Sequence, residues 1–256
     1  MGLLLFYLKE NDKKLNLLNG HLKTINEEKN KFIGIAAHDM RSPIGIIHSF
    51  SDLLIENYKE NLHTEIIEIL EIIKKTSKDG LVMLENLLDI SMIESGNLVL
   101  KYKRQDYISF VKHQIYVNQL IAQKKEISIQ LRSQHDYLLV DFDEHYLSEI
   151  LNNLLSNGIK FSDRNSEITV KISMFDNNQL QTEIIDSGIG IEEKELQNLF
   201  KYFQKTSSSP TEGEKSTGLG LAISKQIIVA HHGMIGVDSS QNKGSNFFFR
   251  IPIEQN

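Results

Sequence analysis

His38 and Asp39 are the adjacent pair of side chains best suited to chemistry in this 256-residue sequence. A neutral imidazole nitrogen is a nucleophile when the proton on the other ring nitrogen is held or taken, and a carboxylate can do either. The surrounding helical pattern repeats apolar residues as a heptad seam, and His38 lies two positions beyond it, so we expect it to face outward. The seam residues are Leu8, Leu15, Leu18, Leu22, Ile25, Phe32 and Ala36. A lone outward histidine is more often simply solvated, so the pair needs support from the rest of the chain.

Pro43 lies in the same helical stretch, four residues after Asp39. Its ring nitrogen carries no hydrogen, so the carbonyl of Asp39 loses its usual helical partner. We therefore expect the helix to be weakened or bent within one turn of His38. A locally loosened helix suits a reactive group that alternates between states.

Two asparagines in the second half of the sequence could coordinate a cation. Asn153 and Asn157 lie four residues apart in a predicted helix and so share one face. Their carboxamide oxygens are suitable ligands for Mg2+, which takes few protein ligands when phosphates supply the rest. Lys160 falls on the same side and could meet a phosphate. Asparagines on helices are more often caps or surface residues, so this spacing alone leaves both interpretations open.

Two glycine-containing stretches have the chemistry of a nucleotide site. Asp186 ends a predicted strand, where a buried carboxylate could accept the exocyclic amine of adenine, and the glycines after it would let a ligand approach the backbone. The run STGLGL at 216–221 opens a predicted helix, whose free N–H groups favour phosphate. Each of these sequence patterns, taken alone, is also typical of an ordinary turn.

The elements that position these residues divide into two kinds. Helical periodicity from Leu8 to Asn57 and from Thr64 to Ile93 predicts a hairpin, and its long apolar face predicts a homodimer with a four-helix bundle. Turn residues at 94–97 mark a boundary, after which strands and helices predict an α/β sandwich, with helices on one face of a mixed sheet. The expected strands are 98–103, 127–131, 137–140, 168–175, 180–185, 234–238 and 246–253, and the expected helices are 108–124, 143–161 and 219–230.

Composition narrows the function classes. The formal charge of −6 and the 24% of charged residues give no sign of a nucleic-acid partner. The absence of cysteine excludes disulfides, thiolate zinc sites and cysteine nucleophiles. The apolar run at 3–8 is much shorter than the roughly 20 residues that cross a bilayer. We expect no membrane segment and a cytoplasmic chain, either complete or cut from a larger membrane sensor.

The order of these features resembles the two-component sensor histidine kinases. HDMRSPI at 38–44 resembles their H box, and the asparagine pair, DSGIG at 186–190, LFKYF at 199–203 and STGLGL resemble the N, first glycine, F and second glycine boxes of their ATP-binding domain. The resemblance implies a helical hairpin forming a dimeric four-helix bundle, followed by an α/β sandwich of the Bergerat type. The domains would be a signalling coiled coil at 1–30, a dimerisation and phosphoacceptor domain at 31–96 and a catalytic ATP-binding domain at 97–256.

The resemblance also implies roles for individual residues. His38 would receive the phosphoryl group with help from Asp39, and Ser42 stands where members that dephosphorylate their partner usually have Thr or Asn, which leaves that reverse activity open. Asn157 would hold Mg2+ with Asn153 beside it. The remaining ATP-binding residues would be Lys160, Phe161, Asp186, Gly188, Gly190, Thr217, Gly218, Leu219 and Gly220, with 204–215 as a mobile lid.

The predicted function is an ATP-dependent protein-histidine kinase that passes a phosphoryl group from His38 to an aspartate of a response-regulator receiver domain. Related ATPases carry a glutamate that activates water where this chain has Asn153, which disfavours simple ATP hydrolysis. The alternative is a catalytically silent dimeric ATP-binding adaptor, against which the intact His38, Asn157 and Asp186 argue. The signal, a possible upstream sensor domain or protein, the cognate regulator, and transfer within one chain or across the dimer stay open.

Overall fold

The computed structural model forms two compact units, Met1–Leu98 and Val99–Asn256. It describes residues 2–176, 178–204, 207, 211 and 218–254, and their side chains except those of 2–9, 22, 27 and 61. Thr217 and most of the expected lid therefore lie outside the described residues. Within the described part of the chain, no helix combines the length and apolar composition that a membrane crossing needs.

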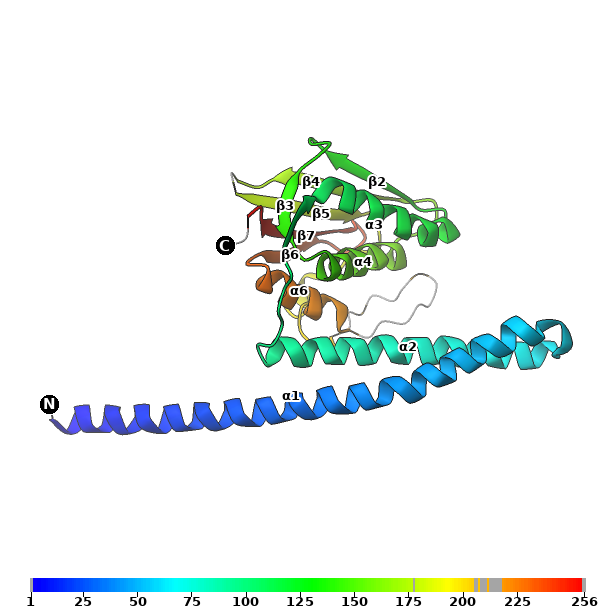
Figure 1. Cartoon of the computed structure of the whole chain (residues 1–256). Helices are drawn as coiled ribbons and strands as arrows, with labels where there is room; N and C mark the ends of the chain where they lie inside the picture. Colours follow the sequence, from blue (N-terminus) through cyan, green and yellow to red (C-terminus); the bar gives the residue numbers. More distant parts are fainter. Residues whose placement is uncertain (1, 177, 205–206, 208–210, 212–217, 255–256) are drawn as a thin grey trace. The chain divides into compact units, whose positions relative to one another are not determined.

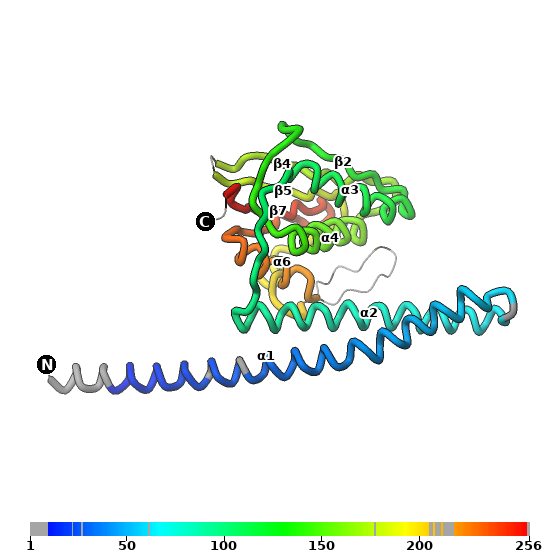
Figure 2. The backbone as a smooth tube through the Cα atoms, viewed as in Figure 1, coloured from blue at the N-terminus to red at the C-terminus, as the bar shows by residue number. Residues whose placement is uncertain are grey.

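The first unit is a hairpin of two long helices (Figure 1). Helix α1 spans Gly2–Tyr58, the short 3-10 helix η1 spans Lys59–Asn61, and α2 spans Thr64–Glu94. α1 continues unbroken through Pro43, and its axis curves along the second half (Figure 2). Contacts with α2 hold this part of α1: Asp52 forms an ion pair with Lys74. The lost bond at Pro43 therefore does not end α1.

The face by which α1 packs on α2 differs from the predicted seam. The buried positions Asn30, Ala37 and Ser51 are spaced by multiples of seven, and Ser77, Leu84 and Ser91 repeat in the same way on α2. The predicted seam residues Leu15, Leu18, Ile25 and Phe32 are 56–73% exposed. Leu8 and Leu22 have side chains outside the described set. The seam is thus an apolar face that the hairpin leaves uncovered, and pairing with a second chain stays a prediction.

The second unit is a mixed sheet with helices on one face, as expected (Figure 1). Its five strands lie in the order β2-β4-β5-β7-β6, with β2 and β4 parallel and the other pairs antiparallel, and β1 pairs with β3 in a separate ladder. The strands are β1 Lys103–Asp106, β2 Ser128–Ser133, β3 Leu139–Phe142, β4 Glu167–Met174, β5 Gln179–Asp186, β6 Met234–Ser239 and β7 Ser245–Pro252. The helices are α3 Tyr107–Ala122, the short 3-10 helix η2 Gln123–Lys125, α4 Glu144–Phe161, α5 Glu193–Leu196 and α6 Gly220–Ala230.

The prediction of a strand at 98–103 is wrong, because β1 begins only at Lys103. The preceding residues are held by contacts other than a strand ladder, because the N–H of Lys101 donates to Asp143 Oδ2 at 2.6 Å and the Tyr102 hydroxyl donates to the carbonyl of Ala230 at 3.0 Å. The third strand also lies two residues later than predicted, at Leu139–Phe142. Partners distant in sequence fix both segments.

His231 joins the ends of α4 and α6 in the same region. Its side chain is fully buried; Nδ1 lies 2.9 Å from the carbonyl of Ile227, and Nε2 accepts the N–H of Asp143 at 3.3 Å. Asp143 caps α4, because its Oδ1 accepts the N–H groups of His145 and Tyr146. With the proton on Nδ1, both ring nitrogens have a hydrogen-bond partner. A second proton, on Nε2, would point at the N–H of Asp143, so the charged form is disfavoured. Burial accordingly lowers the pKa of His231 from 6.5.

We expect this buried imidazole to make the second unit less stable in mild acid. An unfolded chain gains a proton on His231 below about pH 6.5, whereas the folded chain, with its lower pKa, does not, so stability falls as the pH drops through that value. Each unit of pKa depression corresponds to about 1.4 kcal/mol. Thermal unfolding from pH 7.5 to 5.5 should show His231→Gln to be less stable than the unaltered protein at pH 7.5, with a gap that narrows below pH 6.5.

The exposed neighbour His232 provides the control for this prediction. His232 has a φ of 55°, which asparagine tolerates, and burial is the main cause of the lowered pKa of His231, so His232→Asn should keep most of the pH dependence. Asp143 and Tyr102 are the other titratable groups beside His231 and are common to all three proteins. A stability gap between His231→Gln and the unaltered protein that stayed constant from pH 7.5 to 5.5 would contradict the assignment.

Candidate functional site

His38 projects from α1 with 77% of its side chain exposed, and Asp39 with 72%. The outward orientation expected from the heptad pattern is therefore present. His38 Nδ1 lies 3.3 Å from Asp39 Oδ1, so the two side chains meet although adjacent helical residues do not face each other directly. When Nδ1 carries the proton, Nε2 is the nitrogen with a free lone pair. Ser42 is exposed one turn further along α1.

Helix α4 positions the two asparagines differently. Both are partly exposed, whereas Leu147, Leu151 and Leu154 on the other side of the helix are fully buried. The Asn157 carboxamide makes no hydrogen bond with any described residue. Such a half-buried, unengaged amide is suited to a ligand or a cation.

Asn153 instead contacts α6. Its Nδ2 donates to Ser224 Oγ at 3.0 Å, and a Cβ on Gly220 would overlap its Oδ1. Asn153 therefore joins α4 to the glycine-containing start of α6. Leu219 is fully buried at the N-cap of α6, and the first N–H groups of that helix have no intrahelical acceptors. An anion could bind there.

Asp186 is the buried carboxylate at the end of β5, with 8% exposure. Its Oδ1 accepts the N–H of Gly188 at 2.9 Å and that of Ser245 at 3.1 Å, whereas Oδ2 accepts no hydrogen bond from a described residue. Burial raises the pKa of Asp186, although the two N–H donors oppose the shift. One oxygen is thus fixed by the protein and the other is left for a donor from a ligand.

Close backbone contacts surround Asp186. A Cβ on Gly188 would overlap the carbonyl of Phe161, the last residue of α4, and the N–H of Ile189 donates to the same carbonyl at 3.2 Å. A Cβ on Gly244, where φ is 80°, would overlap the carbonyl of Asp186. These glycines bring the end of α4 and the β6–β7 turn against the carboxylate. Gly190 and Gly218 also have positive φ, 66° and 71°.

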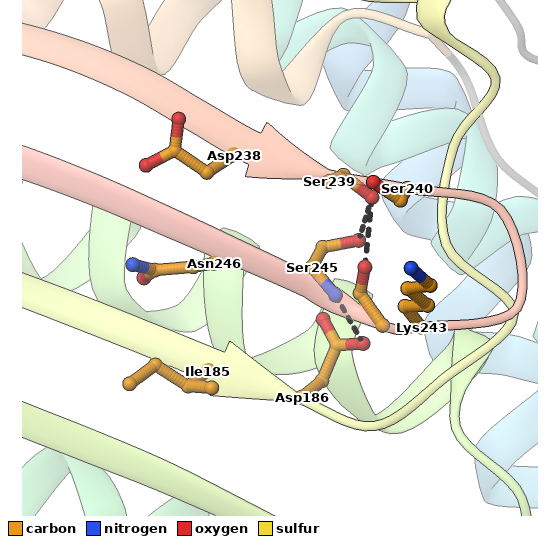
Figure 3. Close-up of a pocket in the computed structure, with 9 residues that line it drawn as sticks. Ile185, Asp186, Asp238, Ser239, Ser240, Lys243, Ser245 and Asn246 are labelled. Atoms are coloured by element: carbon orange, nitrogen blue, oxygen red, sulfur yellow. Dashed lines mark hydrogen bonds between the residues drawn. The ribbon is translucent and has the colours of Figure 1, made fainter.

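A pocket of about 280 Å³ borders Asp186 at the β6–β7 turn (Figure 3). Much of it belongs to the sheet face opposite the helices, because Ile185, Asn246 and Asp238 are cross-strand neighbours that alternate with buried residues. It shares Asp186 with the candidate site, and Figure 3 shows the Asp186 carboxylate beside Ser245 rather than beside Asp238. The helix-side surface around Asn157 and Oδ2 of Asp186 is therefore the better candidate for nucleotide binding.

Sequence reasoning assigned no role to Gly158, although it follows Asn157 directly. A Cβ there would lie 3.2 Å from Ile168 Cδ1 and 3.9 Å from Asp186 Cβ, so glycine lets α4 approach the sheet beside the carboxylate. A glycine inside a helix is costly and signals such a packing reason. Ser245, which donates to Asp186, carried no comparable signal. Gly244, in the β6–β7 turn, supports Asp186 through its close approach to the Asp186 carbonyl.

Two family models match the chain. Residues 142–255 match the histidine kinase-, DNA gyrase B- and HSP90-like ATPase family, and residues 28–96 match the His Kinase A (phospho-acceptor) domain. Hybrid signal transduction histidine kinase D of Dictyostelium discoideum is 25% identical over 97% of this chain and 16% of its own length. Cyanobacterial phytochrome B of Nostoc sp. is 30% identical over 93% of this chain and 31% of its own length. Sensor histidine kinase WalK of Bacillus subtilis is 27% identical over 90% of this chain and 38% of its own length.

A solved structure shares the fold. The full-length protein ShkA in complex with AMPPNP matches with a TM-score of 0.75 at 21% identity, covering 88% of this chain and 46% of that chain. The chain spans less than half the length of each of these relatives. A phosphoacceptor hairpin followed by an ATPase-type sheet domain defines the class. The chain belongs to the two-component sensor histidine kinases.

Proposed function

We propose that this chain is an ATP-dependent kinase that phosphorylates its own His38 and transfers the phosphoryl group to an aspartate of a response-regulator receiver domain. The observation that carries the proposal is the exposed His38 imidazole with Nδ1 beside the Asp39 carboxylate. Asp39 holds the Nδ1 proton while Nε2 attacks the γ-phosphorus of ATP. An N–P bond forms, the bond to the bridging oxygen breaks, and ADP leaves. The carboxylate of the receiver domain's aspartate then attacks the same phosphorus, the N–P bond breaks, and the His38 imidazole is regenerated.

The second unit supplies the nucleotide site of this proposal. Oδ2 of Asp186 accepts a hydrogen bond from the adenine amine, and Phe161 lines the same end of the site. The unengaged Asn157 amide fits Mg2+, which would neutralise phosphate charge when bound. Gly188 and Gly190 shape the adenine pocket. Lys160 contacts phosphate, and Gly218 and Gly220, with Thr217 and Leu219, shape the phosphate end. Because the reaction consumes ATP, we place it in the cytoplasm.

Assembly and signal input complete the proposal. The uncovered apolar seam around Leu15, Leu18 and Phe32 supports a homodimer through a four-helix bundle. Residues 1–30 would form the signalling coiled coil, 31–96 the phosphoacceptor domain and 97–256 the catalytic domain. An upstream sensor domain or protein would act through the coiled coil. The silent-adaptor alternative has no observation in its favour.

The direct test is incubation of the protein with ATP labelled at the γ-phosphate. A phosphoramidate on histidine is labile in acid and stable in base, so the label should survive alkali and be released by acid. Label that resists acid would assign the phosphoryl group to a hydroxyl side chain instead. Absence of label in the presence of Mg2+ would contradict the proposal and favour the adaptor.

Ser42 is expected to make dephosphorylation of the partner slow. Its hydroxyl has three staggered positions, and the methyl group of threonine restricts this choice, so Ser42→Thr should raise the rate by at most about threefold. The measurement is loss of label from a purified phosphorylated receiver domain. Ser42→Ala is the control and should show the lowest rate. Rapid dephosphorylation by the unaltered protein would contradict the expected slow rate. Equal dephosphorylation rates for the unaltered protein and Ser42→Ala would show that the hydroxyl takes no part in this reaction.

A further inference from the structure

Lys125 is a buried cation at the end of η2, with 4% exposure. Its Nζ donates to the carbonyls of Ile159 at 3.2 Å and Lys160 at 3.4 Å. Both carbonyls belong to the last turn of α4, whose acceptors have no intrahelical donors. A positive charge at this end also stabilises the helix dipole. Lys125 therefore caps the turn that carries Lys160 and Phe161.

Lys125 also contacts Thr211 in the segment between Gln204 and Gly218. Nζ lies 2.8 Å from Thr211 Oγ1, which in turn lies 3.1 Å from the carbonyls of both Lys160 and Ser162. The main-chain N–H of Thr211 donates to the carbonyl of Lys160 at 3.0 Å. The threonine hydroxyl thus accepts from the ammonium and donates to the same turn of α4. Thr211 is attached by both side chain and main chain.

The same turn also contacts the loop after Asp186. The carbonyl of Phe161 accepts the N–H of Ile189 at 3.2 Å, and Gly188 packs directly on it. The last turn of α4 is therefore the point where the Asn157 helix, the Asp186 loop and the chain at Thr211 meet. Lys125 reaches this point from η2 without contributing to the surface, because it is buried.

We propose that Lys125 is a positioning residue for nucleotide binding, which acts by clamping Thr211 onto the C-terminal turn of α4. The inference rests on the proposed function, because the nucleotide is ATP. Lys125 does not touch the ligand; its ammonium holds the hydroxyl of Thr211 and the carbonyls of Ile159 and Lys160 in one arrangement. Loss of the clamp weakens ATP binding, whereas phosphotransfer at saturating ATP changes little.

The test compares variants of the full chain with a fluorescent ATP analogue and with ATP. Thr211→Val removes the hydroxyl from an exposed, similarly shaped side chain, and one such hydrogen bond corresponds to an affinity loss of about two- to tenfold. Lys125→Met should weaken binding at least as much. The double variant should lose less than the sum of the two single losses, because both substitutions remove the Lys125–Thr211 hydrogen bond. Thr211→Ser should restore binding.

Ser207→Ala is the matched control in the same segment. Ser207 contacts Glu195 of α5 through its N–H at 2.7 Å and its Oγ at 3.2 Å, so loss of the hydroxyl should leave ATP affinity within a factor of about two. Additive losses for Lys125→Met and Thr211→Val, or an unchanged affinity for Thr211→Val, would overturn the clamp and leave the kinase proposal intact. No ATP binding by the unaltered protein would overturn both.

Discussion

Asp186→Asn is expected to weaken ATP binding strongly while the second unit stays folded. Asparagine keeps one carbonyl oxygen, which can accept the N–H groups of Gly188 and Ser245 as Asp186 Oδ1 does. The other atom becomes an NH₂ donor, which would face the N–H donor of the adenine amine. Replacing a charge-assisted hydrogen bond by two opposed donors costs about 3 kcal/mol or more, an affinity loss of about 100-fold.

The same substitution should leave the unit as stable or more stable at pH 7. Burial raises the pKa of Asp186, so the folded chain binds the proton more tightly than the unfolded chain. Stability therefore falls as the pH rises above 3.8, the ordinary pKa of an aspartate, and the cost persists at neutral pH. A neutral amide removes that cost, and any advantage in thermal unfolding should shrink as the pH approaches 3.8.

Asp238→Asn is the matched control for this prediction. Asp238 borders the same pocket as Asp186, but it is exposed on the sheet face opposite the helices. Calorimetric titration with ATP should show near-normal affinity for this variant. Unchanged affinity in Asp186→Asn would remove that carboxylate from the adenine site, and loss in Asp238→Asn would move the site to the other face of the sheet.

Local periodicity was sufficient for most of the helices and strands of the second unit, but not for the order of the strands in the sheet. The helices expected at 143–161 and 219–230 match α4 and α6 to within one residue at each end. The pair Asn153 and Asn157 could be placed on one face because four residues make about one turn. Contacts between elements had no such signal: Asn153 meets Ser224, 71 residues away, and Lys125 meets Thr211, 86 residues away.

The hairpin shows a second limit of pattern reading. Its packed face includes small or polar residues, such as Asn30, Ser51 and Ser91, and Ser91 Oγ donates to the carbonyl of Asn30 at 2.5 Å. Such residues allow close approach of two helices but do not register as an apolar stripe. The apolar repeat therefore identified the face that this chain leaves exposed. Polar positions separated by multiples of seven residues, such as Asn30 with Ser51 and Ser77 with Ser91, were the overlooked signal.

His38→Ala should abolish phosphoprotein formation and most ADP release, while ATP affinity stays near normal. The nucleophile belongs to the first unit, and the proposed nucleotide residues belong to the second. ADP release should fall with phosphorylation because Asn153, which stands where related ATPases carry a glutamate that activates water, is an amide whose Nδ2 donates to Ser224. Parallel measurements of ADP and bound phosphoryl would test both parts.

Two further variants complete this experiment. Asp39→Asn keeps an acceptor for the Nδ1 proton but loses its charge, which should slow phosphorylation by about tenfold. His21→Ala removes another exposed histidine of α1 and should change nothing. An adaptor would release negligible ADP in every variant, whereas a simple ATPase would continue to turn over without His38. ADP release by His38→Ala at the unaltered rate would require the phosphotransfer mechanism to be abandoned, because the ATP would then be reacting with water.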